Sequence, residues 1–184
     1  MSYGATYREM LKEIRETLAN LDENSPYQGQ GFEIAGFVWF SGWNDMLDYN
    51  PSYVDVLAHF IRDVRRDLKA PNLPFVIGQV GQFPDEVQPG ANNSKLRAAQ
   101  ADVAELPEFK GNVKLVPTDP FWDREADAAL NALLKQESQN LRDEWDKVGS
   151  DLGYHYLGSA KTFCAIGKAF GEGMIELCPT GAKN

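Results

Sequence analysis

Residues 36–46 read GFVWFSGWNDM, and this stretch decides the fold class. Its four consecutive apolar residues belong to a β-like run that spans residues 32–40. A run that is apolar on both faces suits a central parallel strand covered by helices on both sides. The small residues that follow, Ser41 and Gly42, predict a loop where the strand ends.

The rest of the chain alternates between strand-like and helix-like patterns. We predict strands at 32–40, 75–80 and 113–116, and helices at 7–21, 51–68, 94–106, 125–134, 141–148 and 157–174. This alternation is typical of an α/β fold with a parallel sheet and helices on both faces. We therefore expect one domain over residues 1–184. Ligands in such folds bind beyond the carboxyl ends of the strands, so the loops at 41–50, 81–93, 117–123 and 149–156 are the candidate site.

The composition is that of an ordinary globular protein with an acidic balance. Of the 184 residues, 43% are apolar and 24% are charged, and 18 Lys and Arg against 27 Asp and Glu give a net charge of −9. This balance argues against a nucleic-acid partner, which requires a broad basic surface. The basic cluster Arg62, Arg65, Arg66 and Lys69 is interleaved with Asp63 and Asp67, so we interpret it as a solvated helix face.

Several other classes of protein are disfavoured by simple patterns. No stretch approaches the roughly 20 apolar residues of a membrane span, so we expect no membrane partner. The first residues lack the pattern of a signal peptide, and the compartment stays open. Cys164 and Cys178 lack zinc-type spacing, although a single bridge between them stays open. We expect no metal and no cofactor.

The chain has two histidines, and they differ in their surroundings. His59 lies inside a predicted helix, where a surface histidine is the ordinary interpretation. His155 lies in a loop before the last helix, four residues after Asp151, a carboxylate that can orient an imidazole. From spacing alone, a structural histidine at a loop–helix junction is as well supported as a catalytic one.

The loop after the first strand has two interpretations. Gly42 lets backbone N–H groups approach a ligand, and Asn44 offers an amide donor, as in an oxyanion hole. The alternative is a tight turn with Trp43 packed over it. Ser41 follows a strand but lacks the preceding Gly-x of a nucleophile elbow, so a nucleophilic role for Ser41 is the least favoured interpretation.

Two stretches together resemble the sialate O-acetylesterase domain, a carbohydrate-esterase branch of the SGNH-type hydrolases. They are residues 36–46 and residues 153–161, which read GYHYLGSAK, and the resemblance runs in order over residues 5–176. It implies a three-layer, flavodoxin-like sheet and a serine esterase that removes O-acetyl groups from sugars. His155 would be the general base, Asp151 its orienting acid, and the loop with Ser41, Gly42, Trp43 and Asn44 the oxyanion and substrate site.

The chain also departs from the family pattern. Family members usually carry the nucleophile in a Gly-Gln-Ser-Asn turn near the N-terminus, and this sequence has no such motif. We therefore expect an N-terminally incomplete domain. Ser41-Gly42-Trp43 replaces the common Gln-Gly-Glu, and the spacing from Asp151 to His155 is one residue longer than the usual Asp-x-x-His.

These departures leave three explanations open. The chain is a fragment of a longer esterase whose nucleophile is supplied elsewhere, a non-catalytic carbohydrate-binding or assembly protein, or an esterase in which Ser41 has become the nucleophile. An acetylated carbohydrate is the expected substrate of the first. Because an incomplete sheet exposes strand backbone, we also expect a homo-oligomer, or another partner, to cover the open edge.

Overall fold

The computed structural model describes residues 4–24, 31–84, 91–135 and 141–178. Within them, three strands form one parallel sheet in the order β1-β2-β3, with the bounds β1 Phe37–Trp39, β2 Phe75–Gln79 and β3 Val113–Pro117. The register pairs Phe37 with Phe75, and Phe75 with Val113. The predicted parallel α/β sheet is therefore confirmed.

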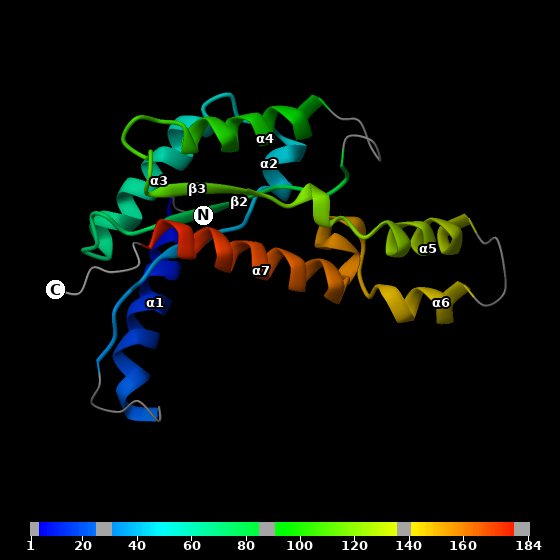
Figure 1. The fold of residues 1–184 in the computed structure, drawn as a ribbon, viewed down its shortest axis with the longest axis horizontal. Coiled ribbons are helices and arrows are strands. Elements are labelled where there is room, and N and C mark those ends of the chain that lie inside the picture. Colours follow the sequence, from blue (N-terminus) through cyan, green and yellow to red (C-terminus); the bar gives the residue numbers. More distant parts are fainter. Residues whose placement is uncertain (1–3, 25–30, 85–90, 136–140, 179–184) are drawn as a thin grey trace.

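Helices lie on both faces of this sheet, which gives the three layers that the sequence predicts (Figure 1). One face carries α3 Tyr53–Asp67 and α4 Ala91–Ala104, and the other carries α7 Ala160–Leu177. The remaining elements are α1 Ala5–Asn24, α2 Trp43–Leu47, η1 Asp119–Phe121, α5 Arg124–Lys135, α6 Leu141–Val148 and η2 Gly153–Gly158. No helix among the described residues is both long and apolar enough to cross a membrane.

Two hydrophobic cores stabilise the fold. Under α3 and α4, the first core includes Ile61, Val64 and Leu96, packed with Phe75 and Ile77 of β2. The second core gathers residues that follow β3, Trp122, Trp145, Tyr156, Leu157 and Ile166, with Phe40 and Phe170 packed against it. This second core places the segment that carries His155 directly against the carboxyl end of the sheet.

The first strand is shorter and less central than its sequence predicts. Only Phe37–Trp39 is extended and paired, and within the described sheet β1 pairs with β2 alone. Val38 is 44% exposed, whereas the first four residues of β2 are buried. The aromatic rings of Phe37 and Trp39 pack on Phe60 of α3. The apolar run therefore reflects packing on that face and does not make β1 the central strand.

Two other boundaries differ from the prediction. The loop after β1 contains the short helix α2, and the last helix begins at Ala160, three residues later than expected. Tyr156, Leu157 and Gly158 have φ angles of 51°, 63° and 60°, which a right-handed helix cannot contain. Ser159 then caps α7 by accepting a hydrogen bond from the Thr162 N–H.

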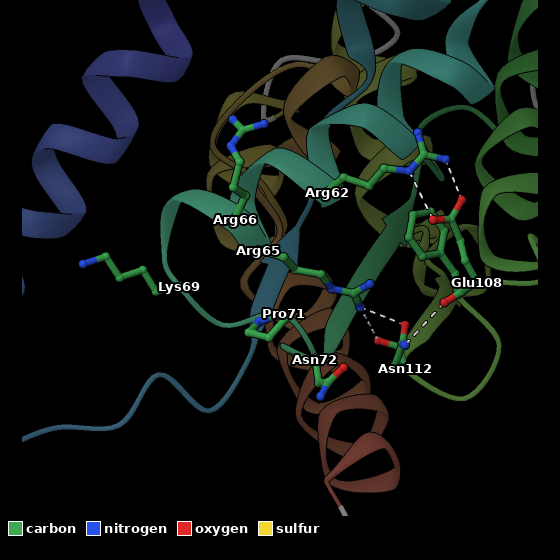
Figure 2. Close-up of a pocket in the computed structure, with 9 residues that line it drawn as sticks. Arg62, Arg65, Arg66, Lys69, Pro71, Asn72, Glu108 and Asn112 are labelled. Carbon is green, nitrogen blue, oxygen red and sulfur yellow. Dashed lines mark hydrogen bonds and ion pairs between the residues drawn. The ribbon is translucent and has the colours of Figure 1, made fainter.

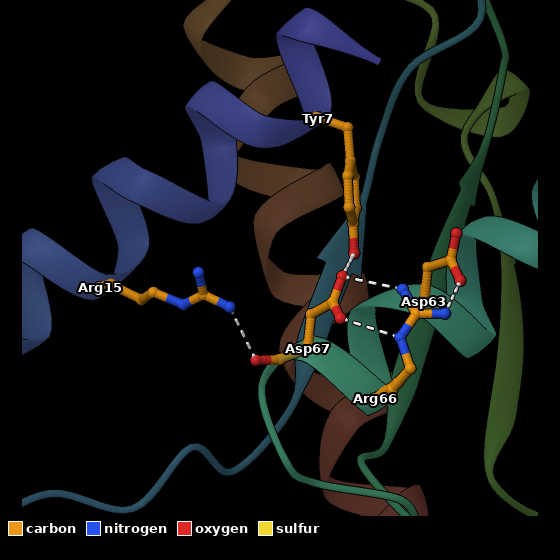
Figure 3. A network of polar contacts seen from close by, with 5 residues as sticks. All are labelled: Tyr7, Arg15, Asp63, Arg66 and Asp67. Carbon is orange, nitrogen blue, oxygen red and sulfur yellow. Dashed lines mark hydrogen bonds and ion pairs between the residues drawn. The ribbon is translucent and has the colours of Figure 1, made fainter.

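The helix α1 projects from the body and is attached to the end of α3 (Figures 1 and 3). The Tyr7 hydroxyl donates to Asp67 Oδ2 at 2.8 Å, and Arg15 donates to the Asp67 carbonyl at 3.1 Å. Arg66 binds the same carboxylate and that of Asp63. Burial, reinforced by the Asp67 carboxylate, raises the pKa of Tyr7 well above its usual range.

The structure also corrects the interpretation of the basic cluster and answers the question of the cysteines. Arg65 is only 7% exposed and is therefore a buried residue, although the alternating charges predict a solvated face.

Cys164 and Cys178 are both free. Among the described residues, no three His, Cys, Asp or Glu side chains gather into a site that could hold a metal ion.

Candidate functional site

The structure places His155 and Asp151 in direct contact. His155 Nδ1 lies 2.7 Å from Asp151 Oδ2, and Asp151 Oδ1 accepts a hydrogen bond from the Leu152 N–H. Both side chains are exposed, 61% for His155 and 43% for Asp151. The hydrogen bond from His155 is the main cause that lowers the pKa of the Asp151 carboxyl. Because Nδ1 faces the carboxylate, Nε2 is the nitrogen left to accept a proton.

A closed backbone loop holds this pair in place. The N–H groups of Ser150 and Asp151 both donate to the Leu157 carbonyl, at 2.9 and 3.2 Å. In return, the N–H groups of His155 and Leu157 donate to the Leu152 carbonyl, at 3.0 and 3.1 Å. The left-handed φ angles of Tyr156 and Leu157 reverse the chain so that these bonds can form. Such angles are unfavourable for bulky residues and persist only where surrounding contacts enforce them.

Tyr156 ties this loop to the ends of two strands. Its hydroxyl accepts from the Gly81 N–H at 2.8 Å and lies 2.7 Å from Thr118 Oγ1. Thr118 donates its own proton to the Gln79 carbonyl at 2.7 Å, so the Tyr156 proton goes to Thr118. The result is one directed chain of hydrogen bonds. Tyr156 is 2% exposed, and burial raises its pKa to about 12.

The Ser41–Asp45 loop is anchored through its backbone. The buried amide of Gln100 donates to the Ser41 carbonyl at 3.2 Å and accepts from the Val80 N–H at 2.9 Å. Gly42 has a φ of 153°, and a Cβ there would lie 2.5 Å from the Val80 side chain. Glycine is therefore required at this turn. The side chains of Ser41 and Asn44 are exposed.

Trp43 joins the two loops that the sequence singles out. Its ring lies 5.8 Å from the ring of Tyr154 and 5.7 Å from that of Phe83, centroid to centroid. Tyr154 in turn lies 4.4 Å from the imidazole of His155. The two loops therefore meet through aromatic rings. Within the described part of the chain, no hydrogen bond joins Ser41 or Asn44 to His155 or Asp151.

Several residues that build the site are not among the sequence candidates. Arg97 of α4 donates to the carbonyls of Val80, Gln82 and Phe83, and so fixes the loop after β2. The sequence could have indicated Gln100, because it is a polar residue on the apolar face of a predicted helix. It could not have indicated the hydrogen bonds of Thr118 and Tyr156, because their partners lie far away in the sequence.

The carboxylate of Asp123 lies beside the site and has a structural role. It is 6% exposed, accepts from Ser159 Oγ at 2.7 Å, and caps α5 by accepting from the N–H groups of Glu125 and Ala126. Lys161 Nζ lies 3.8 Å from Oδ1, the oxygen that caps α5, whereas Ser159 binds Oδ2. The Asp123–Ser159 pair therefore joins the starts of α5 and α7, and both oxygens of the carboxylate are already engaged.

A family model described as carbohydrate esterase, sialic acid-specific acetylesterase, matches residues 1–137. The matched region contains all three strands and the Ser41–Asp45 loop, and it ends before Asp151 and His155. No curated protein and no solved structure gives a significant match.

Proposed function

The chain belongs to the sialic acid-specific acetylesterase family of carbohydrate esterases, and from this membership we propose that it acts on O-acetyl esters of sugars with His155 as general base. The family implies a function of the carbohydrate acetylesterase type. The observation that carries the assignment of the base is the 2.7 Å contact between His155 Nδ1 and Asp151 Oδ2.

The proposed reaction is an acyl transfer in two steps. A hydroxyl oxygen attacks the acetyl carbonyl carbon while its proton passes to His155 Nε2, and the carbonyl electron pair moves onto oxygen. When that pair returns, the bond from the acetyl carbon to the sugar oxygen breaks, and the sugar oxygen takes the proton from the imidazolium. Water then releases acetate by the same sequence. Asp151 orients the imidazole and stabilises its charged form.

We propose that the nucleophilic hydroxyl comes from outside this chain. Ser41, the one serine of the candidate loop, is held through its carbonyl by Gln100 and makes no hydrogen bond to His155. In this proposal, the N–H groups after Gly42 and the amide of Asn44 stabilise the developing oxyanion. The rings of Trp43 and Tyr154 supply an apolar wall for the sugar.

The test is acetate release from an aryl acetate, from acetylated xylan and from O-acetylated sialic acid. A triad without its nucleophile retains a residual activity of roughly 10³–10⁴-fold over water in proteases. We expect a weak release above this background, in which His155 acts as general base on water, so that His155→Ala lowers it to the background and Ser41→Ala leaves most of it. His59→Ala is the matched control, because that imidazole lies on the exposed side of α3 against the Asp55 carbonyl.

Two results would contradict the proposal. Loss of all activity in Ser41→Ala, together with labelling of Ser41 by a fluorophosphonate, would make Ser41 the nucleophile. Release no greater than the His155→Ala background would mean that this chain alone is not an esterase. A non-catalytic carbohydrate-binding or assembly role would then be the function to test.

We also propose that a second copy of the chain covers the open edge of β1. Within the described sheet, this edge has no neighbouring strand, and Val38 of the same strand is 44% exposed. An unpaired strand edge is a template for another strand, and two identical edges are complementary when they run antiparallel about a two-fold axis. Such a pair would satisfy the free backbone groups of Val38 in both copies.

A further inference from the structure

Two pockets of opposite character lie along α3. The pocket at the carboxyl end of this helix is lined by the cations Arg62, Arg65, Arg66 and Lys69 (Figure 2). Its arginines are already bonded within the protein, Arg62 and Arg66 to carboxylates, and Arg65 to carbonyl and side-chain amide oxygens. The Lys69 side chain extends away from the Arg65 guanidinium. These cations therefore do not converge on one ligand.

The second pocket lies beside the amino-terminal half of α3 and has a volume of about 170 Å³. It is enclosed by residues of β1, α2 and α3, and most of its lining is apolar or aromatic. The lining residues are Trp39, Asp45, Asn50, Tyr53, Val56, Leu57 and Phe60. The rings of Trp39 and Phe60 lie 4.4 Å apart, centroid to centroid, so they form one continuous aromatic wall.

Asp45 is the one charged residue in the lining of this pocket, and it has no counter-charge. Its carboxylate is half-buried, and this burial is the main cause that raises the pKa of Asp45. The hydrogen bond from its own backbone N–H lowers that pKa, and no Lys or Arg of the described residues acts on it. Withdrawing a carboxylate from water without a compensating cation is unfavourable. A cation in the pocket would remove that cost.

The pocket is separate from the site that contains His155, although residues of α2 contribute to both. Trp43, the first residue of α2, packs against Tyr154 and Phe83. Asp45 follows two residues later and lines the pocket. Side chains two residues apart on a helix point in directions that differ by about 200°. A ligand bound to Asp45 would therefore lie on the other side of α2 from the imidazole.

We propose that this pocket binds a small organic ammonium ion, with Asp45 as the counter-charge and the rings of Trp39 and Phe60 as the wall. Aromatic rings attract cations and also pack against the carbon atoms that surround an ammonium nitrogen. A hard metal ion fits poorly, since it requires several oxygen ligands and the lining holds a single carboxylate. A neutral ligand would leave the charge of Asp45 unbalanced.

The test follows the indole N–H signal of Trp39 in two-dimensional NMR spectra while the full chain is titrated with tetramethylammonium chloride. A parallel titration uses tert-butanol, a neutral molecule of similar size and shape, and both are made at a constant ionic strength of about 0.15 M. We expect saturable binding of tetramethylammonium in the millimolar range, since the ligand has few atoms. We expect tert-butanol to bind at least roughly tenfold more weakly.

Asp45→Asn keeps the size of the side chain and removes its charge. We expect this variant to bind tetramethylammonium roughly tenfold more weakly than the wild type does. Its Tm without ligand should be no lower than that of the wild type, because a partly buried charge is removed. Asp48→Asn is the matched control and should bind like the wild type, since Asp48 is an exposed carboxylate outside the pocket lining.

A second variant separates the shape of the pocket from its charge. Val56 lines the pocket and is 55% exposed, so Val56→Phe narrows the cavity and should weaken the binding of both molecules. The proposal is overturned if tetramethylammonium does not bind the wild type, if tert-butanol binds as tightly, or if Val56→Phe leaves binding unchanged. It is also overturned if Asp45→Asn binds tetramethylammonium as tightly as the wild type, or if Asp48→Asn weakens binding as much as Asp45→Asn.

Discussion

At the scale of single residues, the pair formed by Asp151 and His155 makes stability depend on pH. The hydrogen bond from His155 lowers the pKa of Asp151 in the folded protein. A carboxyl with a lowered folded pKa stabilises the fold above its unfolded pKa, and this contribution disappears as pH falls through the folded pKa.

We therefore predict that Asp151→Asn is less stable than the wild type around pH 7, and that the two converge at about pH 3 or below. Urea unfolding at both pH values measures this difference. Asp146→Asn, an exposed carboxylate that pairs with Arg142 on α6, is a control for a charge change elsewhere. A constant difference between Asp151→Asn and wild type at all pH values would contradict the assigned hydrogen bond.

The hydroxyl of Tyr156 should contribute measurably to stability. Tyr156→Phe leaves the buried Gly81 N–H without its acceptor and Thr118 without its donor, and an unsatisfied buried group costs about 1–3 kcal/mol. We expect a loss of that size in the free energy of unfolding. Tyr154→Phe is the matched control, because the structure gives its hydroxyl no hydrogen bond. An equal loss in both variants would show that the chain of hydrogen bonds is not the cause.

At the scale of elements, periodicity predicted the helices and strands that depend on local pattern. The bounds of α6 agree with the prediction, and those of β2 and β3 differ by one residue, because apolar spacing and flanking turn residues mark these elements. The place of β1 at the sheet edge was not predictable, since an apolar run shows that faces are covered but not which strands pair.

The candidate site was also predictable only where it depends on local sequence pattern. The spacing of Asp151 and His155 suggested their contact, whereas the reversal at Tyr156 and Leu157 left no trace in the sequence. Bulky residues rarely take positive φ, so the pattern there favoured a helix. The long-range bonds from Tyr156 to Gly81 and Thr118 compensate for that local preference.

Tyr7 and Arg15 attach α1 to Asp67 at the end of α3 (Figure 3). Tyr7 donates to the Asp67 carboxylate and Arg15 to the Asp67 backbone carbonyl, so replacing the Asp67 side chain removes the first of these two bonds. We predict that Asp67→Ala speeds amide hydrogen exchange throughout α1 and leaves β2 protected, since opening can be local. Lys12→Ala is the control, because the ion pairs of Lys12 with described residues are those with Glu9 and Glu16 of its own helix. Equal exchange in α1 of wild type and Asp67→Ala would contradict this role.

At the scale of the whole molecule, the open β1 edge predicts association. We expect a dimer in sedimentation velocity experiments, and we expect Val38→Lys to shift it to monomer, because a charged residue on an edge strand opposes pairing. Leu134→Lys is the matched control, since Leu134 is also exposed, at 65%, but lies on α5. A monomeric wild type, or an unchanged dimer in Val38→Lys, would refute the arrangement.

The directed chain from Gly81 through Tyr156 and Thr118 to Gln79 encloses two hydroxyl protons. Because Tyr156 and Thr118 are almost completely buried, these protons can exchange with water only when the segment that carries His155 lifts away from the sheet. In a proton NMR spectrum they should therefore persist as resolved signals. Their lifetimes would then measure how often the loop that carries His155 opens.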